Sequence, residues 1–235
     1  MSYDRYQEWK GWGGADAFTV RDPGYYRAEF RGLPLKGARV IEIGFGDGAC
    51  LAWLKSVGAE VTGLEIQEGL VALARERGFD ARLADDFDWS AHAGAIDLIC
   101  GFDVLEHFGD DAMADLLRRC AVALKHGGVC LFRTPNGASP FGLHLQHADI
   151  THVTPVTGAR MRHLLLEKRL DGLTLETWRD QAQSPGKGLG AVRKALSGMM
   201  RALTRFIIHN GYLRGEPIPL AQNAVIVLRR TAAPA

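Results

Sequence analysis

The sequence predicts an α/β fold built on a doubly wound, mostly parallel sheet. From residue 36 onward, short apolar runs typical of strands alternate with amphipathic runs typical of helices, the pattern of a parallel sheet covered on both faces. The first of these strands, 39–43, leads into a turn containing Gly44, Gly46 and Gly48. Rossmann-like sheets bind nucleotides at this position, so the turn marks an expected ligand site. A chain of 235 residues is long enough for one such domain.

Seven strands are expected, separated by helices or loops that begin and end at glycine, proline or polar residues. The run 95–101 is apolar except for Asp97, as expected for a strand buried on both faces. The helix at 110–124 is expected to stop at Lys125-His126-Gly127-Gly128. The expected strands are 39–43, 60–64, 81–84, 95–101, 129–134, 173–178 and 221–229, and the expected helices between them include 49–56, 67–77, 110–124 and 159–168.

An aromatic segment, 1–35, precedes the domain at 36–235. The segment is rich in aromatic side chains, which are usually buried. It is therefore expected to pack on the sheet domain as a cap, or to close over its site as a lid that excludes water. Tyr6 and Trp9 have helical spacing, and Gly11 ends that helix. The regular pattern also stops at 136–157, a stretch with three histidines that is expected to be a loop carrying chemistry.

A basic insertion at 181–215 separates the last two strands. It contains no aspartate or glutamate, and apolar residues recur at helical spacing between 188 and 210. These features predict a basic amphipathic helix. Such a helix packs on its own domain, gates the site, or contacts a membrane surface or a second copy of the chain in a homodimer.

Composition limits the classes of partner and compartment. The formal net charge of +1 does not favour nucleic acid, and none is expected as a partner. The four cysteines lie in or beside apolar runs without C-x-x-C spacing, which is typical of reduced core residues in a cytoplasmic protein. The polar N-terminus and the lack of an apolar run near 18 residues predict a soluble chain.

The glycine turn fits two cofactor classes. Gly44-x-Gly46-x-x-Ala49 satisfies the dinucleotide fingerprint of NAD-dependent oxidoreductases. Glu42-x-Gly44-x-Gly46-x-Gly48 instead resembles motif I of class I S-adenosylmethionine-dependent methyltransferases, in which the acidic residue helps to hold the methionine end of the cofactor. Glu65 follows the second strand, about twenty residues past the glycines, where an acid accepts hydrogen bonds from ribose hydroxyls in both classes.

Two further motifs resemble the methyltransferases and have no counterpart in the oxidoreductases. Asp85, with Asp86 as the alternative, resembles the acid that receives the adenine amino group, and 97–108 resembles the fourth-strand motif with its Leu-Glu-His ending. The resemblance covers about 38–135 and implies a last strand inserted antiparallel. It implies S-adenosylmethionine as the cofactor, contacted by Glu42, Gly44, Phe45, Gly46, Gly48, Glu65, Ile66, Asp85, Asp86, Phe87, Asp103, Val104 and His107.

Three histidines are candidates for a general base. His152 is the first choice and His147 the second, because both lie after the fifth strand, and His107 of the Leu-Glu-His motif is the third. A neutral imidazole with a pKa near 6.5 can remove a proton from an attacking hydroxyl. His147, Asp149 and His152 also form an alternative ligand set for a divalent ion, although no metal is otherwise expected.

The expected reaction is methyl transfer to an oxygen of a small or medium polar acceptor. The stretch 133–142 resembles the acceptor region of methyltransferases associated with bacterial cell-surface glycans and sugar nucleotides, which implies a sugar or sugar phosphate and a role in polysaccharide biosynthesis. Arg133 suits an anionic acceptor or a structural ion pair. The alternatives are an NAD-dependent oxidoreductase and a non-catalytic subunit that binds the cofactor.

Overall fold

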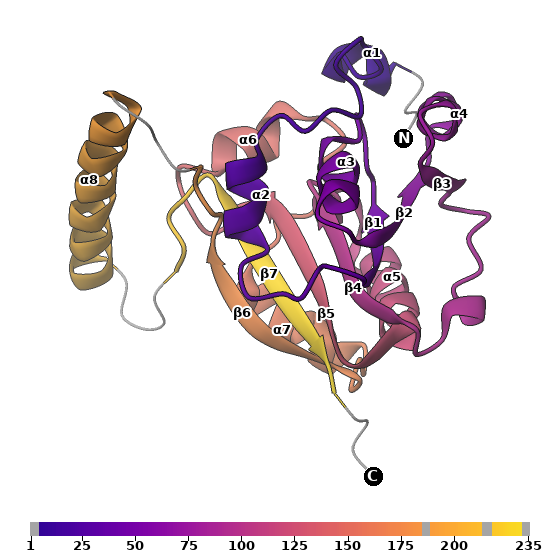
Figure 1. Ribbon diagram of the computed structural model, residues 1–235. Coiled ribbons are helices and arrows are strands. Elements are labelled where there is room, and N and C mark those ends of the chain that lie inside the picture. The colour runs from indigo at the N-terminus through magenta and orange to yellow at the C-terminus, as the bar shows by residue number, and fades with distance from the viewer. Residues whose placement is uncertain (1–4, 185–188, 213–217, 232–235) are drawn as a thin grey trace.

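A seven-stranded mixed sheet forms the centre of the computed structural model, which describes residues 5–184, 189–212 and 218–231 (Figure 1). The ends of the expected basic insertion, at 185–188 and 213–217, lie outside these residues. β7 is antiparallel to both of its neighbours, and the pairs among the first five strands are parallel. The Rossmann-like fold with an antiparallel last strand is therefore confirmed. The strand order is β3 (Asp80–Leu83), β2 (Glu60–Glu65), β1 (Arg39–Ile43), β4 (Ile96–Phe102), β5 (Leu124–Pro135), β7 (Asn223–Arg230), β6 (Leu173–Asp180).

Helices cover both faces of the sheet, as the alternation of patterns predicts. On one face lie α2 (Pro23–Glu29), α3 (Ala49–Ser56) and α4 (Glu68–Glu76), and on the other lie α5 (Asp110–Ala123) and α7 (Gly158–Glu167) (Figure 1). The sequence of β4 is apolar apart from Asp97, because its alternate side chains enter the two cores. Ile99 packs with α5 and α7, and Cys100 packs with α2 and α3.

Three local features differ from the expected pattern. β5 already begins at Leu124, so the expected helix stop at Lys125–Gly128 lies inside the strand, beside an irregularity in its pairing with β4. The expected loop at 136–157 contains a short helix, α6 (Leu143–Ala148), which buries Gln146. The helix α2 had a signal that the pattern analysis passed over. Asp22 accepts a hydrogen bond from the N–H of Tyr25, and Pro23 occupies the first helical turn.

The N-terminal segment crosses the glycine turn after β1. α1 (Tyr6–Lys10) forms where the aromatic spacing predicts a helix, and its C-terminal Gly11 is left-handed. Farther along, Phe18 packs against Phe45 of the turn, with ring centroids 5.9 Å apart, and the N–H of Phe18 donates to the carbonyl of Asp47 at 2.7 Å. The N-terminal segment is thus part of the wall around the ligand site.

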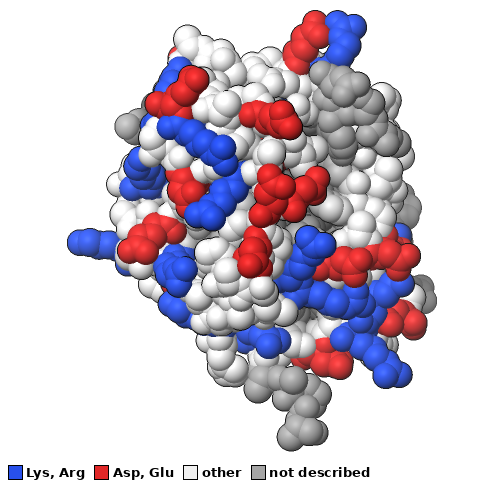
Figure 2. Space-filling model, turned by 90° about the vertical axis from the view of Figure 1, so that its right-hand side faces the viewer, with Lys and Arg blue, Asp and Glu red and all other residues white. Residues whose placement is uncertain are grey.

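Two short helical turns, η1 (Ser90–His92) and η2 (Leu105–His107), and one long helix, α8 (Leu189–Gly211), complete the described elements. Among the described residues, no helix combines the length and the apolarity needed to cross a bilayer. On the face drawn in Figure 2, basic and acidic side chains are interspersed, in line with the near-balanced composition.

The contact between Phe18 and the glycine turn predicts an unusually costly alanine substitution. Gly48 has φ +74°, and a Cβ there would overlap the Phe18 ring. Gly48→Ala should therefore lose about 1–2 kcal/mol from the left-handed backbone and roughly 1–3 kcal/mol more from overpacking. Urea unfolding measures both.

Gly78 provides the matched control, because its φ is +78° and a Cβ there would meet nothing within 4 Å. Gly78→Ala should show the backbone cost alone. Equal losses in the two variants would mean that Phe18 does not pack on Gly48 in solution.

Candidate active site

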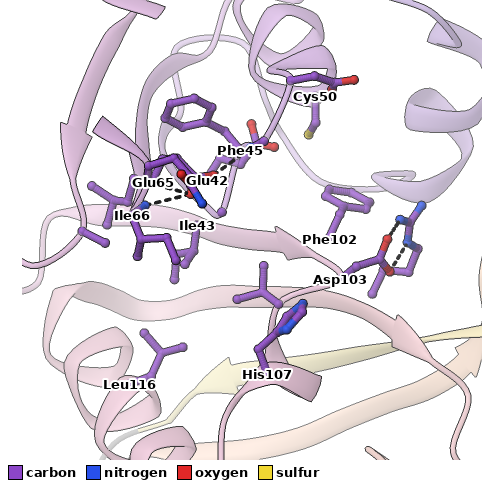
Figure 3. A pocket seen from close by; sticks show the side chains of 18 of the residues that line it. Glu42, Ile43, Phe45, Cys50, Glu65, Ile66, Phe102, Asp103, His107 and Leu116 are labelled. Carbon is purple, nitrogen blue, oxygen red and sulfur yellow. Dashed lines mark hydrogen bonds and ion pairs between the residues drawn. The ribbon is translucent and has the colours of Figure 1, made fainter. Parts of the chain in front are cut away.

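A cavity of about 750 Å³ opens at the carboxyl ends of the first five strands (Figure 3). This size lies within the range of small-molecule sites. Its walls come from the glycine turn, the ends of β2, β3 and β4, the first turns of α5, and the N-terminal aromatic segment. The lining residues from that segment are Tyr6, Lys10, Trp12, Arg21 and Tyr26.

Glu65 ties the glycine turn to the end of β2. Its Oε2 accepts the N–H of Gly46 at 3.0 Å, and its Oε1 accepts the N–H groups of Ile66 at 2.8 Å and Gln67 at 3.3 Å. Burial raises the pKa of Glu65, and these three bonds oppose that shift. A carboxylate has about four lone-pair sites, so Glu65 keeps acceptor capacity toward the cavity.

Glu42 lies at the bottom of the cavity beside the thiol of Cys50. Burial raises the pKa of Glu42 to about 8, and among the described residues its Oε2 has no hydrogen-bond partner. A buried polar atom without a partner is uncommon in folded proteins. Since Glu42 lines the cavity, a ligand with a polar group at this end would satisfy it.

Most of the residues expected to hold a cofactor line this cavity. Glu42, Gly44, Phe45, Gly46, Glu65, Ile66, Asp85, Asp103, Val104 and His107 do so. Three of the expected residues do not line it. Gly48 faces the Phe18 ring. Asp86 is exposed, and Phe87 packs in the core against Trp89.

Sequence reasoning missed the part of the wall contributed by α5 and by the residues next to η1 and η2. Trp89, Phe108, Ala112, Asp115, Leu116 and Arg119 also line the cavity. Leu116 is half-buried on α5 and packs at the edge of the core that Met113 and Leu117 of this helix enter. A position at the edge of an apolar helix face is the signal that could have indicated it.

His107 is the histidine that faces the cavity. It rises from η2, which follows β4, toward the space below the glycine turn (Figure 3). Its Nδ1 lies 2.9 Å from the hydroxyl oxygen of Thr151 and 3.3 Å from the carbonyl oxygen of Thr151. A carbonyl can only accept, so Nδ1 carries the proton and Nε2 carries the lone pair.

Asp149 reinforces this choice of tautomer through Thr151. The Thr151 hydroxyl and N–H both donate to Oδ1 of Asp149, at 2.5 and 3.0 Å. With its only hydroxyl proton committed to Asp149, Thr151 Oγ1 acts as an acceptor for His107. Burial lowers the pKa of His107, and the nearby His152 lowers it further, so the imidazole is neutral at pH 7.

The N-terminal helix α1 closes over the same group of residues. The Tyr6 hydroxyl donates to Oδ2 of Asp149 at 3.0 Å, and Lys10 Nζ lies 3.3 Å from that oxygen. Although burial alone would raise the pKa of Asp149, the hydrogen bonds from Thr151 and Tyr6 lower it to about 2. The ring of Tyr6 also meets the His107 ring edge to face, with centroids 5.9 Å apart.

The two histidines favoured from sequence are placed differently. His152 lies behind His107, with ring centroids 4.8 Å apart, and it is not among the residues lining the cavity. His147 is exposed on α6. Of the set expected to bind a metal, His152 joins a cluster with Glu106 and His107, whose ligand atoms lie within 4.8 Å of one another, and His147 is outside it.

Arg133 and Asp103 form an ion pair on the opposite wall (Figure 3). Burial opposes the charge of Arg133, but the adjacent Asp103 carboxylate raises its pKa, so the guanidinium remains charged. Arg133 also lies over the Phe102 ring at 5.1 Å from the centroid. Both expected roles of Arg133 remain open, because the paired side chain still lines the cavity.

Comparisons with known proteins agree on the type of domain. The family model described as "Methyltransferase domain" matches residues 21–183. The ubiquinone biosynthesis O-methyltransferase of Xanthomonas oryzae pv. oryzae (strain PXO99A) is 29% identical over 175 residues, which cover 64% of this chain and 72% of that relative.

Solved structures with the same fold are more distant in sequence. A SAM dependent methyltransferase from Archaeoglobus fulgidus superposes with a TM-score of 0.59 at 19% identity, over 87% of this chain and 90% of that one. A chain from the complex between the Haloferax volcanii Trm112 methyltransferase activator and a methyltransferase gives a TM-score of 0.63 at 15% identity, over 100% of both chains. At these identities the similarity is one of fold.

The contact between Tyr6 and Asp149 predicts an acid-dependent loss of stability. Asp149 has a lower pKa folded than unfolded, so its contribution is present above about pH 4 and is lost as the pH falls toward 2. Tyr6→Phe removes one hydrogen bond to this charge and should cost about 1–2 kcal/mol at pH 7. The cost should shrink as the pH approaches 2, as measured by denaturant unfolding at each pH.

Tyr212→Phe is the control, since Tyr212 is exposed beyond α8. An unfolding free energy for Tyr6→Phe equal to that of the parent protein at pH 7 would show that α1 does not dock on Asp149.

Proposed function

The chain belongs to the methyltransferase-domain family and has the class I S-adenosylmethionine-dependent fold, and from this premise we propose that it methylates a phenolic hydroxyl on a small or medium polar acceptor. The family assignment decides against the NAD-dependent alternative. The observation that carries the proposal is the position of His107, which faces the cavity with Nδ1 held by Thr151.

The cavity walls offer groups that match each part of the cofactor. S-adenosylmethionine, when bound, supplies a methyl group on a positively charged sulfur that is a good leaving group. Glu65 would accept the ribose hydroxyls, Glu42 would hold the methionine end, and Asp85 would receive the adenine amino group. The positive φ angles of Gly44 and Gly46 bring bare backbone to the cavity surface between them.

His107 is proposed to act as the general base in place of His152. Its neutral imidazole presents the lone pair of Nε2, which can take the hydroxyl proton as the oxygen attacks the methyl carbon. Thr151 and Asp149 keep the ring in this tautomer and stabilise the imidazolium that forms. Most of the rate enhancement is expected from in-line positioning of the oxygen, the methyl carbon and the sulfur.

The chemistry of the base favours a phenol over a sugar. A phenolic hydroxyl has a pKa of about 10, so an imidazole removes its proton far more readily than that of an alkyl hydroxyl. Tyr6, Trp12, Tyr26 and Phe102 give the cavity an aromatic wall suited to a planar ring. The comparisons do not support the expected sugar acceptor or polysaccharide pathway, because the similar curated enzyme is named for ubiquinone biosynthesis.

Glu65 provides the test of cofactor binding. Glu65→Gln replaces a lone-pair acceptor by an amide whose NH2 group would face the N–H groups now bound to the carboxylate. S-adenosylhomocysteine should bind about 1–3 kcal/mol more weakly to this variant, the scale of hydrogen bonds to a charged group. Isothermal titration calorimetry measures the change.

Glu60→Gln is the control, because Glu60 is exposed at the other end of the same strand. Its affinity for S-adenosylhomocysteine should equal that of the parent protein. Parent-like affinity in Glu65→Gln as well would remove Glu65 from the cofactor site.

His107 provides the test of catalysis. His107→Ala should lower kcat on a catechol or other phenolic acceptor by roughly a hundredfold to ten-thousandfold, with a much smaller effect on the affinity for S-adenosylhomocysteine. Because the pKa of His107 lies below the usual 6.5, the parent rate should rise through an inflection below pH 6.5 and then level off. That inflection should vanish in the variant.

Three companion variants separate the alternatives. His147→Ala should keep full turnover, and Thr151→Val should lose about tenfold in kcat, which Thr151→Ser restores. Loss of turnover in His152→Ala or His147→Ala, with none in His107→Ala, would show that the base is misassigned. Inactivation by a chelator and recovery with a divalent ion would point to metal assistance at Glu106, His107 and His152. Cofactor binding without turnover on any phenolic acceptor would favour the non-catalytic alternative.

A further inference from the structure

The helix α8 (Leu189–Gly211) stands to one side of the sheet domain (Figure 1). Two arginines on it contact the body of the protein. Arg201 donates to the Gln183 side chain at 3.0 Å, and Arg205 forms an ion pair with Asp180 at the end of β6. These contacts set which side of the helix faces the body.

The opposite side of α8 is a continuous apolar stripe that is exposed to solvent. We call the five residues along its centre the seam, and each of them is between 54% and 66% exposed. Met200 and Ile207 extend the stripe beside the seam and are 61% and 50% exposed. The seam residues are Val192, Leu196, Met199, Leu203 and Phe206.

The seam repeats with steps of four, three, four and three residues. This is the 3.5-residue period of helices that pack side by side along their length, whereas a helix packed once across a domain needs no such period. The flanking positions Ala195 and Ala202 are small and exposed, which lets another helix approach closely.

We infer that α8 is a dimerisation helix, and that its seam packs against the seam of a second copy of this chain. Arg201 and Arg205 lie two residues from Leu203, about 160–200° around the helix from it. In a two-fold pairing the arginines of both copies therefore stay on the outer sides, where their own domains already bind them.

The exposed area and the charge placement both favour a second copy over a lipid surface. A stable interface buries roughly 800 Å² on each partner, and seven large apolar side chains at least half exposed supply most of such an area. A helix that lies on an anionic membrane uses arginine and lysine to reach the headgroups. Here the two described arginines contact the body of the protein instead.

Sedimentation velocity of the full chain from about 1 to 100 μM tests the inference. The parent protein should be a dimer that dissociates on dilution, and the double variant Leu196→Glu/Leu203→Glu should be monomeric, with at least a hundredfold weaker association. Thr204→Glu adds the same charge on another side of the same helix and should remain dimeric. A monomeric parent at 100 μM, or a dimer unaffected by the double variant, would overturn the inference.

A cysteine in the seam gives a second readout that does not depend on a destabilising charge. Met199→Cys lies near the middle of the seam, and the four native cysteines are buried. A short bismaleimide should crosslink Met199→Cys into a covalent dimer and leave Thr204→Cys largely monomeric; equal crosslinking of both would contradict the pairing. A parent protein that stays monomeric but binds anionic phosphatidylserine vesicles through the stripe would assign this surface to a membrane and overturn the proposal.

Discussion

The hydrogen bonds from Asp149 through Thr151 to His107 connect the three parts of the chain that form the candidate site. His107 belongs to the strand-end motif of the sheet, Thr151 and Asp149 belong to the segment after β5, and Tyr6 reaches Asp149 from the N-terminal helix. The Thr151 hydroxyl donates to Asp149, so its oxygen and the Thr151 carbonyl oxygen are the acceptors for the proton on Nδ1 of His107. The result is an imidazole with a defined tautomer at the wall of the cavity, which is what general base catalysis requires.

Burial of carboxylates is the second constraint on the site. Glu42, Glu65 and Glu106 are each at most 5% exposed, and burial raises the pKa of all three. Glu65 offsets this cost with three backbone donors, but Glu42 and Glu106 retain oxygens that accept no hydrogen bond from any described residue. Buried carboxylates with a raised pKa and an unsatisfied oxygen are typical of sites that bind a ligand, a proton or an ion.

The sheet and the part of the cavity wall at the strand ends could be predicted from the sequence because their signals are local. Most strands are short apolar runs, and Glu42, Glu65 and Asp85 lie at or within two residues of the ends of their strands. The roles of His107 and His152 could not be ordered in this way. They are separated by 45 residues, and only the packing of the segment after β5 behind η2 decides which ring faces the cavity. The short helix α6 was missed for a similar reason, since glycines and prolines around it gave a loop pattern while tertiary burial of Gln146 stabilised a helix.

The protonation state of the two ring nitrogens of His107 is the most direct test of the proposed chemistry. In the protein with 15N-labelled histidine and bound S-adenosylhomocysteine, NMR at pH 7 reports the protonation of each ring nitrogen, and the spectrum of His107→Gln identifies the signals. We predict a neutral ring with the proton on Nδ1, an unprotonated Nε2, and a titration midpoint below pH 6.5. A proton on Nε2 with a bare Nδ1, or an imidazolium at pH 7, would contradict the assignment of His107 as the base.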